Sequence, residues 1–333
     1  MAAFKVALVG LDSQTVPDWV YTRFEQEKIT FVARELTSRE QLAELAGDAD
    51  IVWVFGSHQC VYAENLDVIP RCGALIRTGS GTDNVPVAEA TQRGIVVCNT
   101  PDAVSDSVAE HTIGLLFACI RQIPVQDRAV RRGIWDRYHA WPGWHLQGQT
   151  LGLIGFGRIP QFLARKLRGF ELNVLTCDPY ANAQKAADLG VKIVDLDTLL
   201  STADYVSVHT PLTDETRHLI TDHTLQRMKT RAILINTSRG PVVDEAALLR
   251  ALREGWIAGA GLDVFETEPI APDHPFVTMD NIVLTPHIAG YSDETTENSW
   301  ELSVETAIDL AHGHFPRSYV NREVNPRWKL TAR

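Results

Sequence analysis

Short apolar runs alternate along the chain with longer segments in which apolar residues recur at helical spacing. Such runs, bounded by polar or glycine-rich turns, are typical of buried parallel strands, and the segments between them are typical of helices that cover a sheet. We therefore predict an α/β protein with two doubly wound parallel-sheet domains. The expected strands lie at residues 6–9, 51–55, 74–76 and 95–97, and then at 151–154, 172–176, 191–194, 205–208, 232–235, 257–262 and 282–284.

Polar residues suited to helix starts precede several of the helical segments. Thr37 or Ser38 can cap the helix that follows them, because either side chain can accept a backbone N–H. Ser107 and Glu110 have the spacing of a capping box, which predicts a long helix over about 105–121. This helix is apolar enough to be packed on two sides, as at a domain junction.

The stretch 151–178 has the pattern of a dinucleotide-binding turn: a strand, a glycine turn, a helix, and a second strand that ends in an acid. Gly155 permits the tight turn, and Gly157 lets a pyrophosphate approach the backbone. Arg158 and Ile159 would supply amides at the start of the helix. The pattern predicts a Rossmann domain that binds a dinucleotide.

Asp178 ends the second strand of this stretch, where a carboxylate can accept hydrogen bonds from the adenosine ribose hydroxyls. The same carboxylate would repel a 2′-phosphate, so the sequence favours NAD over NADP. Pro160 stands where the fingerprint has its third glycine. Proline in a first helical turn loses only an N–H that has no partner within the helix, so we expect the turn to form with a slightly shifted helix.

Composition narrows the classes of function. The 333-residue chain has a net charge of −11, which argues against nonspecific binding to nucleic acid and offers no basic stripe to a membrane. Residues 1–10 lack the charged flank and cleavage site of a signal peptide, and we expect no apolar run long enough to span a bilayer. These features predict a cytoplasmic protein.

The five cysteines lack metal-ligand spacing, so we expect buried thiols and no metal site: Cys60, Cys72, Cys98, Cys119 and Cys177.

Two loops follow first-domain strands and are candidates for ligand binding, because ligands bind at the carboxyl ends of strands in open parallel sheets. They cover residues 55–58 and 77–84. The second offers several unhindered backbone N–H groups, which suit a carboxylate, although it could also be a glycine-rich connection without a ligand. Arg77 could select a second anionic group, but pairing with a nearby carboxylate such as Asp83 is favoured.

Residues 133–144 gather three of the eight tryptophans outside any regular periodicity. Aromatic residues in such clusters often form interfaces, and local packing under the cofactor domain is an equally good interpretation. Under the first interpretation, His139 or Trp141 could reach the substrate pocket of a partner subunit.

Three loops of the second domain end strands and carry ionisable groups, and the rule for open sheets places them at one edge. Reduction of a carbonyl by NADH needs a proton donor near the oxygen and a cation that orients a substrate carboxylate. His287 fits the donor, Glu268 is a candidate partner that would stabilise its cation, and Arg239 can bind a carboxylate or carbonyl through its planar fork. Each residue alone could be structural, but three such coincidences at one sheet edge favour chemistry.

Four runs around these residues closely resemble the D-isomer-specific 2-hydroxyacid dehydrogenases, a family that includes phosphoglycerate dehydrogenases and glyoxylate or hydroxypyruvate reductases. The runs cover residues 208–213, 235–245, 259–266 and 285–290, and they occur in the family's order. The resemblance extends over nearly the whole chain. It implies a Rossmann NAD-binding domain and a flavodoxin-like substrate domain.

The resemblance also implies roles for individual residues. It makes His287 the acid/base, Glu268 its carboxylate partner and Arg239 the residue that orients the 2-oxo acid. Substrate binding is expected at the loop that contains Arg77, Gly79, Ser80 and Gly81. Contacts with NAD are expected from Ser80, Gly155, Gly157, Arg158, Ile159, Asp178, Thr210, Thr237, Ser238, Arg239, Asp263, His287 and Gly290.

Domain limits and assembly follow from the same resemblance. It implies a discontinuous substrate domain of residues 1–103 plus 293–333, in which a final helix over about 293–311 leads the chain back to the first domain. The NAD-binding domain would cover residues 104–292. A homodimer formed through the cofactor domain is expected, with no nucleic acid or membrane partner.

The leading hypothesis is therefore an NAD-dependent oxidoreductase that interconverts a small 2-oxo acid and its D-2-hydroxy acid. Formate dehydrogenases resemble this pattern but have glutamine in place of Glu268, which counts against formate. A phosphite dehydrogenase stays an alternative, and so does an NAD(H)-sensing scaffold that resembles the C-terminal binding corepressors. Glyoxylate or hydroxypyruvate is the substrate that the resemblance implies, and the direction of the reaction is left open.

Overall fold

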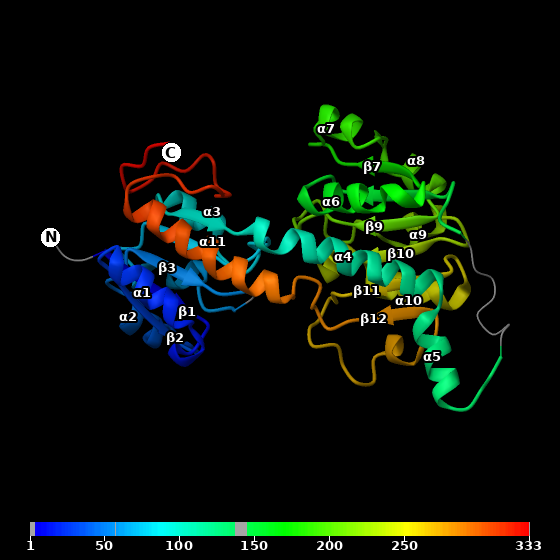
Figure 1. The fold of residues 1–333 in the computed structure, drawn as a ribbon, viewed down its shortest axis with the longest axis horizontal. Helices are drawn as coiled ribbons and strands as arrows, with labels where there is room; N and C mark the ends of the chain where they lie inside the picture. The colour runs from blue at the N-terminus through cyan, green and yellow to red at the C-terminus, as the bar shows by residue number, and fades with distance from the viewer. Residues whose placement is uncertain (1–3, 57, 137–144, 333) are drawn as a thin grey trace. The chain divides into compact units, whose positions relative to one another are not determined.

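The computed structural model describes residues 4–56, 58–136 and 145–332 (Figure 1). Its internal contacts divide the chain into two compact units. Unit 1 contains Met1–Val104 and Ser292–Arg333, and unit 2 contains Ser105–Tyr291. The boundary falls near the start of α4 (Pro101–Ile120).

Unit 1 is built on a five-stranded parallel sheet with the order β2-β1-β3-β4-β5. This is the order of a flavodoxin-like doubly wound sheet, so the predicted fold class of this part is confirmed. The strands are β1 (Phe4–Val9), β2 (Ile29–Arg34), β3 (Ile51–Val54), β4 (Ala74–Arg77) and β5 (Val96–Asn99).

Successive side chains of these strands enter two separate cores, as the two-residue period of a strand requires. On β3, for example, Trp53 lies in one core and Val52 in the other. Helices α1 and α11 cover the first face, and α2 and α3 cover the second (Figure 1). The helical segments of the unit are η1 (Ser13–Thr15), α1 (Asp18–Gln26), α2 (Arg39–Ala46), η2 (Ala63–Val68), α3 (Val87–Gln92) and α11 (Asp293–Ala311).

The helix starts test the capping predictions. Ser38 caps α2, because its side chain accepts the N–H of Gln41. The predicted capping box of Ser107 and Glu110 is wrong, since α4 begins at Pro101 and both residues lie inside the helix. Proline is well suited to a first helical position, where its missing N–H has no helical partner.

Strand β2 is the one strand of unit 1 that sequence patterning does not predict. It is an edge strand next to β1, and only its first residue, Ile29, is buried. Half-exposed edge strands lack the continuous apolar run by which central parallel strands are recognised.

The segment after α11 closes over β5. Asn321, only 1% exposed, accepts the N–H of Val97 through Oδ1 and donates to the Thr91 hydroxyl and the Ile95 carbonyl. These three hydrogen bonds use both N–H donors and the oxygen of the amide, and they join the C-terminal segment to the sheet.

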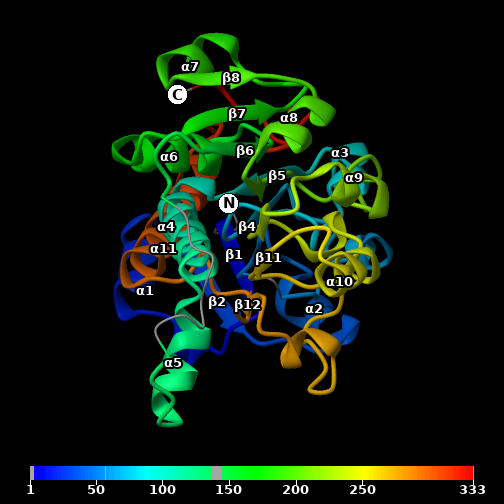
Figure 2. The same ribbon diagram turned by 90° about the vertical axis from the view of Figure 1, so that its right-hand side faces the viewer.

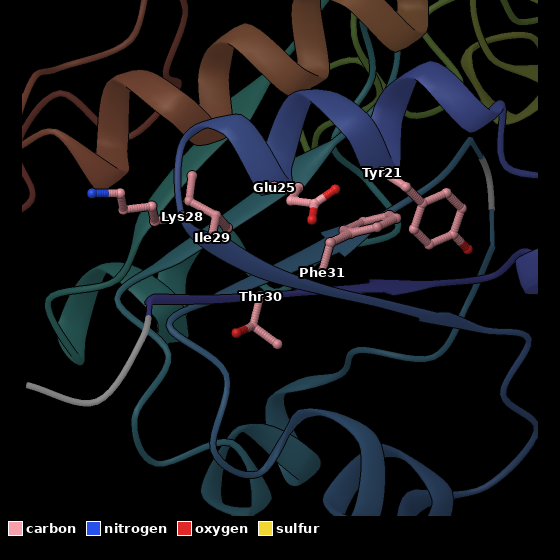
Figure 3. A pocket seen from close by; sticks show the side chains of 6 residues that line it. All are labelled: Tyr21, Glu25, Lys28, Ile29, Thr30 and Phe31. Atoms are coloured by element: carbon pink, nitrogen blue, oxygen red, sulfur yellow. The ribbon is translucent and has the colours of Figure 1, made fainter.

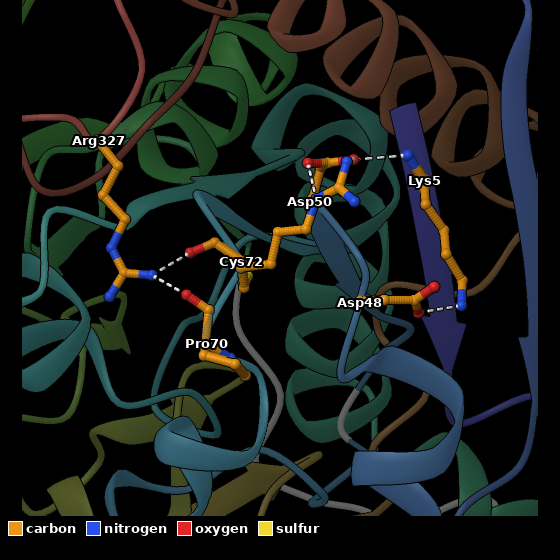
Figure 4. Close-up of polar contacts among 7 residues, drawn as sticks. Lys5, Asp48, Asp50, Pro70, Cys72 and Arg327 are labelled. Carbon is orange, nitrogen blue, oxygen red and sulfur yellow. Dashed lines mark hydrogen bonds and ion pairs between the residues drawn. The ribbon is translucent and has the colours of Figure 1, made fainter. Parts of the chain in front are cut away.

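A second anchor of this segment is Arg327 (Figure 4). Its guanidinium Nη1 donates to the carbonyls of Pro70 at 2.8 Å and Cys72 at 2.9 Å. Nearby, the half-exposed Arg71 binds the buried carboxylate of Asp50 through Nε and Nη2. The turn that leads into β4 is thus held by Arg327 at its carbonyls and by Asp50 at the side chain of Arg71.

Unit 2 contains a seven-stranded parallel sheet with the order β12-β11-β10-β9-β6-β7-β8. Figure 2 shows β8, β7 and β6 in succession at one edge. The order reverses between β6 and β9, as in a Rossmann fold, and all seven predicted strands are confirmed. They are β6 (Thr150–Ile154), β7 (Asn173–Cys177), β8 (Val191–Ile193), β9 (Tyr205–Val208), β10 (Ile233–Asn236), β11 (Gly259–Leu262) and β12 (Ile282–Leu284).

Helices cover both faces of this sheet. Helices α8, α9 and α10 contribute to one core, and α4 and α6 contribute to the other. The helical segments of the unit, after α4, are α5 (Ile123–Arg131), α6 (Arg158–Lys166), η3 (Leu167–Phe170), α7 (Ala183–Asp188), α8 (Leu196–Thr202), α9 (Asp222–Arg227), η4 (Gly240–Val242), α10 (Glu245–Glu254) and η5 (Pro275–Thr278).

Helix α4 is the most apolar of the long helices in the described part of the chain. It has 20 residues and a mean hydropathy of 1.3 over its most apolar window, which makes it a candidate membrane span by length and composition only. Ala109, Leu115 and Leu116 of this helix lie in the core of unit 2, which accounts for its apolar composition.

Candidate functional site

The glycine turn of unit 2 lies where the strand order reverses, between β6 and α6. Gly155 has a φ of +96°, and a Cβ there would lie 2.8 Å from the carbonyl oxygen of His209, so only glycine fits. A Cβ at Gly157 would meet nothing within 4 Å, which leaves room for a ligand beside the backbone. Helix α6 begins at Arg158 without a side-chain cap. Its first N–H groups can therefore bind an anion.

Pro160 is the third residue of α6 and is buried. The helix forms around it, and Gln161 N donates to the Gly157 carbonyl at 3.3 Å. The prediction that proline is tolerated at this place is confirmed.

Asp178 follows β7 and lies beside the glycine turn. Its Oδ2 accepts the N–H of Phe156 at 2.7 Å, and its Oδ1 accepts the N–H of Tyr180 at 2.7 Å. Each carboxylate oxygen can accept more than one hydrogen bond, so both keep a site for a ribose hydroxyl. The open glycine turn, the uncapped helix start and this fixed acid together fit a dinucleotide.

Three hydroxyl groups expected near the cofactor are oriented by neighbours. Thr237, which is buried, shares a hydrogen bond of 2.9 Å with Thr112. Ser238 donates to Oδ1 of Asn236 at 2.8 Å, and Thr210 donates to the following carbonyl. All three positions follow β9 or β10, next to the point where the strand order reverses.

The three residues predicted to carry the chemistry come from loops after β10, β11 and β12. His287 Nδ1 and Glu268 Oε2 are 2.7 Å apart. The other carboxylate oxygen, Oε1, accepts the N–H of Phe265 at 3.0 Å. An ionised carboxylate can only accept, so the ring donates through Nδ1, and Nε2 is the atom left for proton exchange with a ligand.

Opposing effects act on Glu268. Burial alone would raise the pKa of this carboxyl, but hydrogen bonds from His287 and from the Phe265 N–H lower it, as does the charge of Arg239. The net result is a Glu268 pKa below its ordinary value. The group is therefore ionised at neutral pH and accepts the hydrogen bond from His287 as a carboxylate.

Arg239 reaches this region through a close approach of two loops. A Cβ at Gly240 would overlap the carbonyl group of Phe265, so glycine is required for the loop after β10 to lie against the loop that carries Glu268. The Arg239 guanidinium donates to the carbonyl of Ser238 at 2.7 Å. These loops thus bring together the three side chains that the sequence analysis selects.

The predicted substrate loop belongs to unit 1 and follows β4. Gly79 has a φ of +109°, and its N–H donates to the Thr100 hydroxyl at 2.7 Å. Among the described residues, no hydrogen bond acceptor faces the N–H groups of Ser80 and Gly81. Arg77 is buried beneath the loop, and its Nε donates to Asn84 at 3.2 Å.

Comparison with known proteins identifies the relatives of this chain. Residues 113–289 match the family model described as D-isomer specific 2-hydroxyacid dehydrogenase, NAD binding domain. The chain belongs to this family. The dehydrogenase is therefore an NAD-dependent oxidoreductase that interconverts 2-oxo acids and 2-hydroxy acids.

Individual relatives support this assignment. Glyoxylate reductase of Korarchaeum cryptofilum is 45% identical over 267 residues, 79% of this chain and 80% of the relative. Glyoxylate reductase of Thermofilum pendens is 42% identical over 297 residues, 86% of both chains. Among solved structures, the NADPH-dependent glyoxylate/hydroxypyruvate reductase of Sinorhizobium meliloti, in complex with NADP and malonate, is similar to this chain. The two chains are 30% identical and superpose with a TM-score of 0.84. The match covers 98% of this chain and 99% of the reductase. These relatives do not favour the phosphite dehydrogenase, formate dehydrogenase or corepressor-like scaffold.

Asp263 has a further role in the dehydrogenase that sequence reasoning missed. It is 0% exposed, and its carboxylate accepts the Thr285 hydroxyl at 2.6 Å and the N–H groups of Ile288 and Ala289 at 2.9 Å each. Its carbonyl accepts the N–H of His287 at 2.8 Å. Asp263 therefore fixes the conformation of the loop that carries His287.

His111 of α4 was also missed. Its Nε2 lies 3.0 Å from the Thr285 hydroxyl and 3.6 Å from Asp263. Since Thr285 donates to Asp263, His111 is the donor to Thr285. The adjacent pair His111 and Thr112 within an apolar helix was the available sequence signal, because buried polar groups need partners.

The cysteines take no part in this site. Three cysteines are buried, as expected: Cys60, Cys72 and Cys98. Cys119 and Cys177 are only partly buried. Burial raises the pKa of Cys60 to about 12. Thiols with a raised pKa are poor nucleophiles. Within the described part of the chain, no three metal-ligating side chains gather into a group.

A separate hollow of unit 1 lies at the turn between α1 and β2 (Figure 3). Tyr21, Glu25, Lys28 and Phe31 are among the residues that line it. None of the predicted site residues faces it, and its walls carry one carboxylate and one ammonium group. It is therefore separate from the loops that carry the predicted site residues.

Proposed function

We propose that the dehydrogenase reduces glyoxylate, or a 2-oxo acid of similar size such as hydroxypyruvate, to the D-2-hydroxy acid. The observation that carries the chemistry is the 2.7 Å contact between His287 and Glu268, which leaves Nε2 for the substrate. Two of the relatives described above are glyoxylate reductases and the third is a glyoxylate/hydroxypyruvate reductase, which supports a small substrate.

In this proposal His287 is the general acid. It gives the proton on Nε2 to the carbonyl oxygen of the 2-oxo acid, and Glu268 stabilises the charged ring before transfer. Arg239 binds the 2-oxo acid through its guanidinium and holds the carbonyl in place. The cofactor, when bound, supplies the hydride that completes the reduction. In the reverse direction His287 accepts the proton.

The substrate carboxylate would bind to the N–H groups of Ser80 and Gly81. The N–H of Gly79 is not available, because it donates to Thr100. Arg77 lies beneath the loop, and we assign it the support of this loop rather than direct contact with the substrate.

For NAD, the Asp178 carboxylate would accept the ribose hydroxyls, and the amides at the start of α6 would hold the pyrophosphate. Preference for NAD over NADP follows from the charge of Asp178, since no described contact neutralises it with a cation. We assign the remaining contacts to Ser80, Gly155, Gly157, Arg158, Ile159, Thr210, Thr237, Ser238, Arg239, Asp263, His287 and Gly290.

At the domain level, residues 1–103 plus 293–333 would form the substrate-binding domain and residues 104–292 the NAD-binding domain. A homodimer would form through the latter. Helix α5 supports this, because it contains no buried residue and leaves Ile123 and Val130 each 53% exposed. Nearby Trp135 is 77% exposed, whereas His139, Trp141 and Trp144 lie outside the described residues. A cytoplasmic location completes the proposal.

The test is a substrate panel. NADH oxidation would be followed by absorbance with purified protein and 2-oxo acids from glyoxylate to bulky and phosphorylated ones, and then repeated with NADPH. Fastest turnover of glyoxylate or hydroxypyruvate with NADH is expected. A preference for a bulky or phosphorylated acid would refute the proposed substrate, and equal use of NADPH would refute the role of Asp178.

A further inference from the structure

The substrate loop of unit 1 is held by hydrogen bonds at three consecutive residues. The first is Thr78, whose buried hydroxyl accepts the indole N–H of Trp53 at 2.7 Å and lies 3.1 Å from the hydroxyl of Ser303. Trp53 belongs to β3 and Ser303 to α11. The start of the loop is thus joined to two elements of unit 1.

The next two residues are clamped by the end of β5. The N–H of Thr100 donates to the Gly79 carbonyl at 3.0 Å. The side chain of Asn99 donates through Nδ2 to the Ser80 carbonyl at 2.8 Å. Asn99, the last residue of β5, and Thr100, which follows it, therefore bind two consecutive carbonyls of the loop.

These two bonds also orient the amides that would bind substrate. The Gly79 carbonyl belongs to the same planar peptide group as the N–H of Ser80, and the Ser80 carbonyl to the same group as the N–H of Gly81. The two ends of a trans peptide group point in opposite directions. A carbonyl held toward β5 therefore turns its N–H away from β5, and hydrogen bonding at the oxygen also strengthens the N–H as a donor.

Asn99 is itself oriented by the C-terminal segment. The hydroxyl of Ser318 donates to its Oδ1 at 2.6 Å, and the Asn99 side chain is buried. With Oδ1 used by Ser318, the amide must present Nδ2 to the Ser80 carbonyl. Ser318 is held in turn by the neighbouring bridge of Tyr319 to Cys98 and by the buried anchor Asn321.

We propose that Ser318 and Asn99 are positioning residues for the substrate carboxylate: the C-terminal segment, through Ser318, Asn99 and the Ser80 carbonyl, aims the Gly81 N–H at the carboxylate. The inference rests on the proposed function, in which Ser80 and Gly81 bind that group. It gives the C-terminal segment a role in substrate affinity although none of its residues contacts substrate.

The experiment compares steady-state constants for glyoxylate and NADH in the full chain and four variants. Ser318→Ala removes the first hydrogen bond, Asn99→Ala removes both, and Ser318→Thr restores a hydroxyl. Thr331→Ala is the matched control, because among the described residues the hydroxyl of Thr331, in the same segment, bonds to Gly313 and His314 and to no residue of the loop after β4.

We expect the KM for glyoxylate to rise roughly threefold in Ser318→Ala and roughly tenfold in Asn99→Ala, the range that net hydrogen-bond energies of about 0.5–1.5 kcal/mol span. The KM for NADH and kcat should stay within about twofold of wild type. Ser318→Thr and Thr331→Ala should behave as wild type.

Three results would overturn the inference. An unchanged glyoxylate KM in Ser318→Ala and Asn99→Ala, with an active wild type, refutes it while leaving the proposed function intact. A lower kcat together with a similar rise in the KM for glyoxylate and the KM for NADH, with a lowered melting temperature, would show a general structural role instead. A wild type that reduces no 2-oxo acid removes the proposed function and the inference with it.

Discussion

The contact between His287 and Glu268 determines which ring nitrogen of the histidine is left to exchange a proton with a ligand. The carboxylate accepts from Nδ1 at 2.7 Å and is held by the N–H of Phe265, so the ring cannot rotate without losing a charge-assisted hydrogen bond. His287 also has a φ of +55°, a conformation that non-glycine residues seldom adopt. Its N–H bond to the Asp263 carbonyl helps hold it there.

Replacement of His287 by Ala tests the acid/base role. We expect kcat to fall by a factor of at least about 100, the lower end of what general acid–base catalysis contributes. NADH affinity, measured by the fluorescence of the bound nucleotide, should change little. The control is His223→Ala, at an exposed histidine on α9, which should retain wild-type turnover. Normal activity of His287→Ala would remove the assignment.

Replacement of Glu268 by Gln tests its charge. The Glu268 pKa is lowered, so in wild type the carboxylate is charged above that pKa, and its stabilising bond to His287 is lost only as pH falls through it. Gln keeps the shape of the side chain but not its charge. We therefore expect kcat/KM of Glu268→Gln to be lower than that of wild type at neutral pH, and the two pH profiles to converge as pH falls through the Glu268 pKa. A Gln variant as active as wild type at neutral pH would show that Glu268 does not act through charge.

At the scale of elements, parallel strands explain why the site could be predicted. Loops after β10, β11 and β12 must emerge at one edge of the sheet, so Arg239, Glu268 and His287 could be grouped from strand positions alone. The supporting contacts could not be found in this way. They join α4 to a loop that begins 174 residues later, as the bond between His111 and Thr285 shows.

The hydrogen bond between α4 and the loop that carries His287 predicts a measurable effect of His111. Substitution by Leu should lower kcat several-fold and reduce the free energy of unfolding by about 1 kcal/mol, the cost of a lost hydrogen bond. Gln, whose amide can replace Nε2 as a donor, should restore most of kcat. Urea unfolding and steady-state assays test both effects. Equal kcat values for the Leu and Gln variants would contradict the role of this hydrogen bond.

Local signals also explain the element-level errors. The start of α4 was misplaced because Ser107 and Glu110 match a capping pattern, whereas Pro101 begins the helix. Glu110 instead accepts the Lys166 ammonium at 2.8 Å. A spacing rule does not distinguish a cap from a residue pair on one face of a longer helix.

At the scale of the whole molecule, the exposed apolar residues of α5 lead to a prediction about the homodimer. Val130→Asp places a charge on α5, where Ile123 and Val130 are exposed apolar residues seven positions apart. Charge in an apolar interface is costly, so we expect the variant to be monomeric in analytical ultracentrifugation while wild type is a dimer. Ile193→Asp, at an exposed isoleucine of β8, is the control and should leave the dimer intact. A dimeric Val130→Asp would exclude this face.

The amino-acid sequence by itself determined the two doubly wound sheets, the glycine turn with its acid, and the grouping of Arg239, Glu268 and His287 at one sheet edge. These features depend on local periodicity, on conformations open only to glycine, and on residue types at strand ends, all of which act over short stretches. Only the tertiary structure decided that the N–H of Gly79 donates to Thr100, that Asp263 accepts hydrogen bonds from the loop that carries His287, and that Ser318 is linked to the loop after β4 through Asn99. The hydrogen bond from Ser318 joins residues 219 positions apart, and pairings over such separations exist only once the sheets have formed.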